Sequence, residues 1–182
     1  LLILSVVLSL STQQVDYTAA FVQALLSEDE RVYVEMPRGF KRPGKVLKLN
    51  RALYGLRQSP RTWFEHLKGK LLSDVVGFEQ SPNDPCLFYT QDVICVVYVD
   101  DCLFFSPSDV AIESIFTKMR KAELDFNREE DVAGFLGVLI TRSDEEDSIE
   151  LTQTGLIDRI ITAMGLDYAN IAQTPAEYGG LG

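Results

Sequence analysis

Two adjacent carboxylates, Asp100 and Asp101, stand between two apolar runs of strand-forming residues, 94–99 and 102–105. No other turn former separates the runs, so we expect a tight hairpin with both aspartates at its tip. Neighbouring anions repel, and a carboxylate held between buried strands is costly unless it has a partner. The pattern therefore indicates a divalent cation at the tip of this hairpin.

Asp16 is the best candidate for a third ligand, because it ends a predicted strand over 12–16 and precedes a predicted helix over 17–26. If the sheet order places it beside the hairpin tip, three carboxylates supply the hard oxygen ligands that Mg²⁺ prefers. Two Mg²⁺ ions held in this way activate an attacking hydroxyl and neutralise a leaving pyrophosphate. This chemistry needs neither histidine nor cysteine.

Composition is that of one globular domain, because 182 residues with 46% hydrophobic and 24% charged side chains can bury a core. The single His66 excludes a histidine-rich metal site. The three cysteines form no Cys-x-x-Cys pair, which excludes a zinc site of that type and predicts a reducing compartment.

The elements that must position the acids are short strands mixed with helices, which predicts an α+β class with an antiparallel sheet and helices packed mainly on one face. The apolar stretch 1–10 is too short to span a bilayer, and we expect a buried core helix there. Ser59 should cap the helix that follows it, with Pro60 in the first turn. The other predicted strands are 31–36, 45–49, 88–89 and a hairpin of 135–141 with 148–151; the helices are 59–72, 109–124 (with Val110, Ile112, Ile115, Phe116 and Met119 inward) and 153–164.

Net charge is −10, yet the basic residues are concentrated. From Arg38 to Lys70 the chain holds ten lysines and arginines and one acid, Glu65, while the remainder holds seven bases and 26 acids. A basic block in an acidic chain is typical of a patch that meets phosphate, and the alternative is a solvated surface loop. The acidic clusters at 27–30, 129–131 and 144–150 are expected to be solvated turns.

Seven short segments of the chain form a recognisable set. They are Val-Asp-Tyr-Thr-Ala-Ala-Phe (15–21), Val-Tyr-Val-Glu-Met-Pro-Arg-Gly-Phe (32–40), Leu-Tyr-Gly-Leu-Arg-Gln-Ser-Pro-Arg-Thr-Trp (53–63), Asp-Pro-Cys-Leu-Phe (84–88), Tyr-Val-Asp-Asp (98–101), Phe-Leu-Gly-Val-Leu-Ile (135–140) and Thr-Pro (174–175). In these segments the chain resembles the reverse transcriptase domain of Ty1/copia-type LTR retrotransposons. Any one segment is a weak signal, but together they occur in the order of the family and cover nearly the whole chain.

The resemblance implies a right-hand polymerase palm with part of the fingers and the primer-grip hairpin, as one domain over 1–182. It also implies an RNA-directed DNA polymerase that transfers nucleotides from dNTP to a primer 3′ end with two Mg²⁺ ions, Mn²⁺ being the alternative. Relative to the family pattern, we expect truncation at both ends, without the N-terminal fingers, the rest of the thumb and RNase H. The isolated chain should then be inactive.

Position by position, the resemblance implies that Asp16 and Asp100 bind the metals and that Asp101 supports them. Phe21 matches the bulky aromatic under the sugar of the incoming nucleotide, which excludes a 2′-hydroxyl. The alternative for Phe21 is a core residue of an amphipathic helix, which burial statistics favour.

Tyr54 and Gly55 resemble the loop that flanks the nucleotide, where glycine permits close backbone approach. Arg57 and Arg61 then contact template phosphate. The alternative is a plain turn followed by a surface helix. Leu136 and Gly137 fall in the primer grip, for which the alternative is an edge hairpin.

The implied partners are an RNA or DNA template with its primer, dNTP and the other segments of a parent polyprotein, with no membrane. The implied location is intracellular, in the cytoplasm, within a virus-like particle of the parent element. A second class of function stays open: a decayed or domesticated module that binds nucleic acid or serves a structural role. A magnesium phosphohydrolase is a third and weaker reading.

Overall fold

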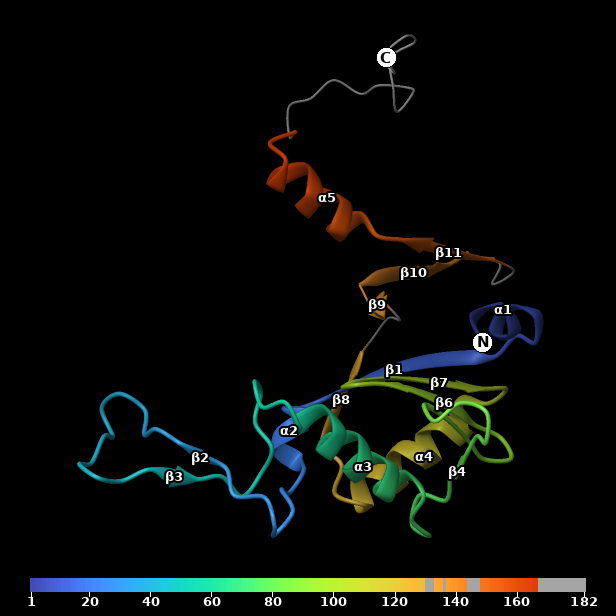
Figure 1. The fold of residues 1–182 in the computed structure, drawn as a ribbon. Helices are drawn as coiled ribbons and strands as arrows, with labels where there is room; N and C mark the ends of the chain where they lie inside the picture. Colours follow the sequence, from blue (N-terminus) through green and yellow to red (C-terminus); the bar gives the residue numbers. More distant parts are fainter. Residues whose placement is uncertain (130–132, 136, 144–147, 167–182) are drawn as a thin grey trace.

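A six-stranded antiparallel sheet, in the order β4-β5-β6-β7-β1-β8, forms the centre of the protein (Figure 1). The computed structural model describes residues 1–129, 133–135, 137–143 and 148–166. Within them the predicted combination of antiparallel strands with helices is confirmed. The strands of this sheet are β1 (Ser11–Tyr17), β4 (Glu79–Gln80), β5 (Leu87–Tyr89), β6 (Ile94–Tyr98), β7 (Asp101–Ser106) and β8 (Phe126–Glu129).

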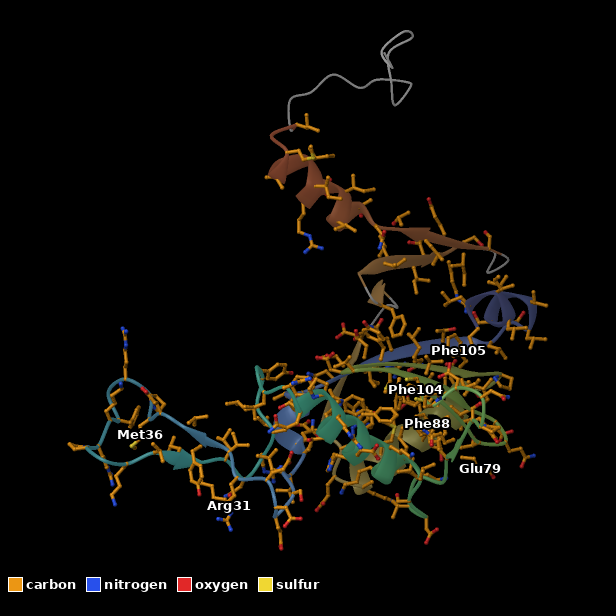
Figure 2. All side chains as sticks on the ribbon, in the orientation of Figure 1. Arg31, Met36, Glu79, Phe88, Phe104 and Phe105 are labelled. Atoms are coloured by element: carbon orange, nitrogen blue, oxygen red, sulfur yellow. The ribbon has the colours of Figure 1, made fainter. Side chains whose placement is uncertain are left out.

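Helices α3 (Ser59–Leu71) and α4 (Asp109–Lys121) cover one face of the sheet (Figure 1). Side chains alternate between the faces of a strand, so Val15 and Tyr17 enter the core while Asp16 points to the other side. Phe88 and Phe104 lie between sheet and helices (Figure 2). The core is therefore aromatic and is built from Tyr17, Trp63, Phe88, Phe104, Phe116, Leu67, Leu71, Ile112 and Met119 among its fully buried members.

Helix α3 confirms the predicted helix over 59–72, with Pro60 in the first turn where its missing N–H leaves no bond unmade. The predicted N-cap role of Ser59 is wrong. Its buried hydroxyl donates to the Leu53 carbonyl oxygen at 2.6 Å and accepts from the Leu53 amide at 3.1 Å. Ser59 thus ties the start of α3 to the preceding loop, and Gln58 takes the cap position without a side-chain bond.

The helix predicted over 17–26 is a single turn, α2 (Ala20–Gln23). It starts late because Ala19 has left-handed backbone angles, with φ 48°. It ends early because the following segment is extended and bonds to 50–52: the Ala52 amide donates to Ala24 and the Leu26 amide donates to Asn50. The Arg51 guanidinium donates to the exposed carbonyls of Val22 and Gln23, at 3.0 and 2.9 Å, and so closes the helix end.

A two-stranded ribbon of β2 (Tyr33–Val34) and β3 (Leu47–Lys48) projects from the body (Figure 1). Arg31 and Met36 mark it in Figure 2. The strands predicted over 31–36 and 45–49 are therefore present but shorter. No described element covers either face of the ribbon (Figure 1), so the alternation of apolar residues does not extend the pairing.

Helix α1 (Leu2–Val7) is not the buried core helix that its sequence predicts. Ile3 is 80% exposed and Val7 71% exposed, and of this helix only Ser5 is buried. Apolar composition misled the prediction because the core lies on the α3 and α4 side of the sheet. The contacts of α1 are with β11 (Ile149–Thr152) instead.

The C-terminal part forms a separate antiparallel sheet of β9 (Ala133–Phe135), β10 (Val138–Arg142) and β11, followed by α5 (Thr154–Ala163). This confirms the predicted hairpin and the last helix, although no residue of α5 is buried. The Arg142 guanidinium anchors β10 to the N-terminal segment through Ser5 Oγ and Thr12 Oγ1, both at 2.8 Å. In the described part of the chain, no helix has the length and apolar character needed to cross a membrane.

Strand β8 was not predicted, because the sequence Phe-Asn-Arg-Glu lacks the apolar alternation that marks a strand. Its hydrogen bonds come from β1, which it joins at the edge of the sheet. Glu129 therefore belongs to a strand and not to a solvated turn. The prediction for α4 holds for Ile112, Ile115, Phe116 and Met119 and is wrong for Val110, which is 78% exposed.

Ile112 and Val110 offer a matched test of this packing, because they are branched residues two positions apart on α4. Ile112→Ala should lower the free energy of unfolding by about 2–5 kcal/mol, since a fully buried side chain leaves a cavity. Val110→Ala should change it by less than about 0.5 kcal/mol. Urea unfolding measures both changes, provided that the slope of the unfolding free energy against urea concentration stays the same. Equal effects of the two substitutions would contradict the orientation of α4.

Candidate functional site

Asp16 and Asp101 are directly opposite each other in the antiparallel pairing of β1 with β7. Opposed residues of neighbouring strands project from the same face, with Cβ atoms about 4.5–5.5 Å apart. The face is the one without α3 and α4, because Val15 and Tyr17 on either side of Asp16 are buried in the core. The register thus brings together two of the three predicted carboxylates from distant parts of the sequence.

The hairpin of β6 and β7 presents the third carboxylate in its turn. Tyr98 pairs with Asp101, which leaves Val99 and Asp100 as the two turn residues. The prediction that both aspartates form the tip is correct for Asp100 and wrong for Asp101, which begins β7. The sequence does not distinguish a turn of Asp100 and Asp101 from a turn of Val99 and Asp100. Shifting the turn by one residue leaves two strands that are equally apolar.

Val99 is held in an unusual backbone conformation, with φ 53°. A two-residue hairpin requires positive φ, but a β-branched residue in that region is rare and costs about 1–3 kcal/mol. The indole Nε1 of Trp63 donates a 2.6 Å hydrogen bond to the Val99 carbonyl oxygen. The residue before Asp100 is therefore strained and also bonded to α3.

Burial, together with repulsion between neighbouring acids, raises the pKa of two carboxylates at the site. The pKa of Asp16 is raised, first by burial and then by the charges of Asp100, Asp101 and Glu129. The pKa of Asp101 is raised by burial and by Asp100 and Glu129, against an opposing hydrogen bond from Gln14 Nε2 to Asp101 Oδ1 of 3.2 Å. Asp16 and Asp100 receive no side-chain hydrogen bond from the described residues. The candidate metal ligands are thus all carboxylates, with few positively charged partners among the described residues.

The three carboxylates are of the chemical type that binds divalent metals, but their side chains are not arranged as a complete metal site. Carboxylates alone are the ligands that Mg²⁺ prefers, and their mutual repulsion is what a cation would relieve. Across the described ranges, however, no group of three acidic, histidine or cysteine side chains is close enough to hold a metal ion. Asp16, Asp100 and Asp101 are therefore neighbours whose side chains would have to turn toward a bound ion.

Phe21 and Tyr54, the two aromatic residues predicted to flank a nucleotide, are in contact with each other near the acids. Their ring centroids are 4.5 Å apart, and Phe21 is 9% exposed whereas Tyr54 is 54% exposed. The pKa of Tyr54 is raised by partial burial and by the charges of Asp100 and Asp16, which places this phenol near the acids. Phe21 belongs to the core, as its alternative interpretation predicts. Its role under the sugar of a nucleotide stays a prediction.

Gly55 has φ 93°, a conformation that side chains rarely adopt. No atom of the described chain lies within 4 Å of where its Cβ would be, so the backbone angle and not crowding requires glycine. Arg57 and Arg61 are exposed, and neither guanidinium makes an ion pair or hydrogen bond with the described residues. Arg61 lines a surface cavity of about 530 Å³ together with Gln58, Thr62, Glu65, His66, Leu25, Ser27 and Glu30.

The basic block is exposed over most of its length. All its lysines and arginines from Arg38 to Arg61 are exposed, and Lys68 and Lys70 are half-buried. One of them pairs with an acid of the ribbon, Lys41 with Glu35 at 3.4 Å. The role of Arg51 at the end of α2 is structural. The ribbon thus presents unneutralised charge at a distance from the body (Figure 1).

Gly137 has φ 73° between β9 and β10, where the pairing shifts register. Leu136 and the Thr-Pro at 174–175 lie outside the described residues, so the predicted primer grip is represented by Gly137 and its strands. These strands are attached to the body through Arg142 and are not part of the central sheet.

Sequence reasoning missed three residues that contact or influence the acids. Gln14 could have been found, since it lies two positions before Asp16 and so shares its face. Glu129 depends on β8, which carries no strand pattern. Trp63 stands out as the single tryptophan, yet nothing in the sequence connects it with Val99.

Comparison with known proteins places this chain among copia-type elements. The family described as reverse transcriptase (RNA-dependent DNA polymerase) matches residues 1–178. The Retrovirus-related Pol polyprotein from transposon TNT 1-94 of Nicotiana tabacum is 29% identical over 96% of the chain and 13% of its own length. That from transposon RE1 of Arabidopsis thaliana is 35% identical over 69% of the chain, and the truncated transposon Ty1-A Gag-Pol polyprotein of Saccharomyces cerevisiae is 31% identical over 59%. The chain spans 9% of each of these two relatives, so it matches a small part of each polyprotein.

Replacing Asp16 with asparagine should stabilise the fold in a pH-dependent way. Because the folded-state pKa of Asp16 is raised, its charged form is disfavoured in the fold, and this cost grows as the pH rises from about 4 through the folded-state pKa. Thermal melts from pH 4 to 8 without divalent ions should show Asp16→Asn melting higher than wild type near neutrality, with the difference vanishing at the acid end.

The control is Asp158→Asn, an exposed acid of α5 that should leave the melting temperature unchanged at each pH. Added Mg²⁺ should raise the melting temperature of the wild type more than that of Asp16→Asn. A difference between Asp16→Asn and wild type that grew toward acid pH would contradict the repulsion at this site.

Proposed function

Because this chain belongs to the reverse transcriptase family, which matches it over residues 1–178, we propose that it forms the palm of an RNA-directed DNA polymerase. The reaction proposed is transfer of a nucleotide from dNTP to a primer 3′ end. The observation that carries the proposal is the register that sets Asp16 opposite Asp101, one residue from Asp100 in the hairpin turn. Its relatives are copia-type Pol polyproteins of plants and yeast.

In this proposal Asp16 and Asp100 hold the metals, with Asp101 in support through its bond with Gln14. When bound, two Mg²⁺ ions, or Mn²⁺ in their place, supply activation of the primer hydroxyl and neutralisation of pyrophosphate. The chain's own contribution is to keep the carboxylates close, because they belong to two hydrogen-bonded strands and one tight turn. The pKa values of Asp16 and Asp101 are raised first by burial and then by neighbouring acids, and a bound cation would offset the contribution of those acids.

The surrounding residues suit the handling of nucleotide and template. Tyr54 and the edge of Phe21 provide an aromatic surface beside the acids, against which a deoxyribose can pack. Arg57 and Arg61 are exposed and have no partner among the described residues, so they can pair with phosphate. Gly137 and its strands are proposed to grip the primer, and together these parts form one palm-type domain with some of the fingers.

The proposed partners are a template with its primer, dNTP and further segments of a Pol polyprotein, within an intracellular particle. The tobacco relative extends well beyond the match, which covers 13% of it. We propose that the clamps on template and triphosphate come from such segments, and that residues 1–182 alone extend primers weakly or not at all.

A second candidate function is nucleic-acid binding without catalysis. The specific observation in its favour is the exposed ribbon, where Arg38, Arg42 and Lys45 face solvent without acidic partners in the described chain. Such a module would bind phosphate through the ribbon and would not need Asp100. The two candidates are separated by what the aspartates contribute.

Asp100→Asn should abolish polymerase activity. For the assay, residues 1–182 replace the aligned segment of the tobacco polyprotein. Extension of a DNA primer on an RNA template by this chimera is measured against Mg²⁺ concentration. Loss of a metal ligand removes several kcal/mol of transition-state stabilisation, so extension should fall at least about a thousandfold, as it should for Asp16→Asn. The control Asp158→Asn should retain activity, and extension that survives Asp100→Asn would refute the proposal.

Neutralising Arg42 and Lys45 together should weaken nucleic-acid binding and its salt dependence. For Arg42→Gln with Lys45→Gln, the slope of log K against log salt should become shallower by about 2, one for each lost phosphate contact. The control of equal charge is Lys118→Gln with Lys121→Gln on α4, at a distance from the ribbon (Figure 1). Fluorescence anisotropy with a primer-template duplex measures both, and identical slopes would show that the ribbon does not contact the duplex.

A further inference from the structure

Trp63 connects strand β1 with the turn between β6 and β7, the two segments that carry Asp16 and Asp100. It is the single tryptophan of the chain, and it is fully buried on α3. Its ring packs edge-on against Tyr17, with centroids 5.0 Å apart, and Tyr17 directly follows Asp16. Its indole Nε1 donates to the Val99 carbonyl oxygen at 2.6 Å, and Val99 directly precedes Asp100.

Side-chain packing does little to hold the turn that receives this bond. Val99 is 41% exposed and its neighbour Tyr98 is 53% exposed, so packing does not fix the turn. Val99 also stands at φ 53°, which a β-branched residue leaves when it can. A hydrogen bond from a buried, rigid indole supplies the restraint that the turn lacks.

The contacts form a closed ring around the site. The Tyr17 amide donates to the Asp100 carbonyl oxygen at 3.0 Å, which ties the turn to β1. Trp63 touches Tyr17 on one side and Val99 on the other, and the peptide chain joins Val99 to Asp100. Each residue of this ring is thereby restrained by two others.

We propose that Trp63 is a positioning residue for the acidic site, and that its indole N–H fixes the turn so that Asp100 is held toward Asp16. The inference rests on the proposed function for the role of the aspartates, whereas the geometry of the turn stands independently of it. Phenylalanine would keep an aromatic ring against Tyr17 but could not donate to Val99. The N–H group, and not only the ring, is what the site uses.

The test replaces Trp63 with 3-benzothienylalanine, which has nearly the same shape but carries sulfur in place of the N–H, and separately with phenylalanine. The matched control is Tyr17→Phe, which keeps the ring contact with Trp63 and removes a hydroxyl whose partner is the Cys102 thiol at 3.9 Å. Amide hydrogen exchange is followed at Tyr17 and at Asp100 without metal. Mg²⁺ binding is followed by calorimetry.

We expect exchange at the Tyr17 amide to accelerate about tenfold in both Trp63 variants, the effect of one lost hydrogen bond. The Mg²⁺ concentration for half saturation should rise by a similar factor. Tyr17→Phe should change neither quantity by more than about twofold. If the benzothienylalanine variant folds with unchanged exchange at Tyr17 and Asp100, the positioning role is overturned.

A second variant, Val99→Gly, tests whether the hydrogen bond from Trp63 acts against the strained backbone of the turn. Val99→Gly accepts positive φ at no steric cost, so the turn should need Trp63 less. Trp63→Phe should then accelerate exchange less in the Val99→Gly background than in wild type, and an equal acceleration in both backgrounds would refute the proposal. If Asp100→Asn leaves primer extension unchanged while the exchange effects occur, the proposed polymerase function fails and the positioning of the turn stands.

Discussion

Asp16 and Asp101 face each other across two hydrogen-bonded strands, and like charges in that position repel. The sheet keeps them there because Val15 and Tyr17 are buried beside Asp16 and because β1 is bonded on both edges. An aromatic core on one face thus stabilises an arrangement that is costly on the other. The site is an acidic pair imposed by backbone pairing, and the charge imbalance it creates is the property from which cation binding is proposed.

Much of the site could be predicted because its signals are local. Asp100 and Asp101 interrupt an apolar run, and Asp16 ends a strand pattern, so their residue types and spacing are visible in the sequence. Helices α3 and α4 and the hairpin of β10 with β11 follow from periodicity in the same way. The detail that one aspartate occupies the turn and the other begins β7 follows from the two-residue loop, which composition does not reveal.

The failures have a common cause in pairing between distant segments. α2 is short because the following residues bond to 50–52. β8 exists because β1 offers it an unpaired edge, and Ser59 leaves the cap position because Leu53 offers it a donor and an acceptor. α1 is apolar yet exposed, since the core formed elsewhere. In each case the structure depends on contacts with another segment or loop. The local propensity of the residues gives no information about such contacts.

The central place of β1 also bears on the order in which the protein assembles. β6 and β7 are joined by two residues and can pair as soon as they are made, whereas β1 pairs with residues roughly 90 positions later. Closing so long a loop is slow, because chain entropy is lost before the contacts compensate for it. We therefore expect the hairpin with Asp100 to form early and the strand with Asp16 to dock late, so that binding competence arises only in the last steps of folding.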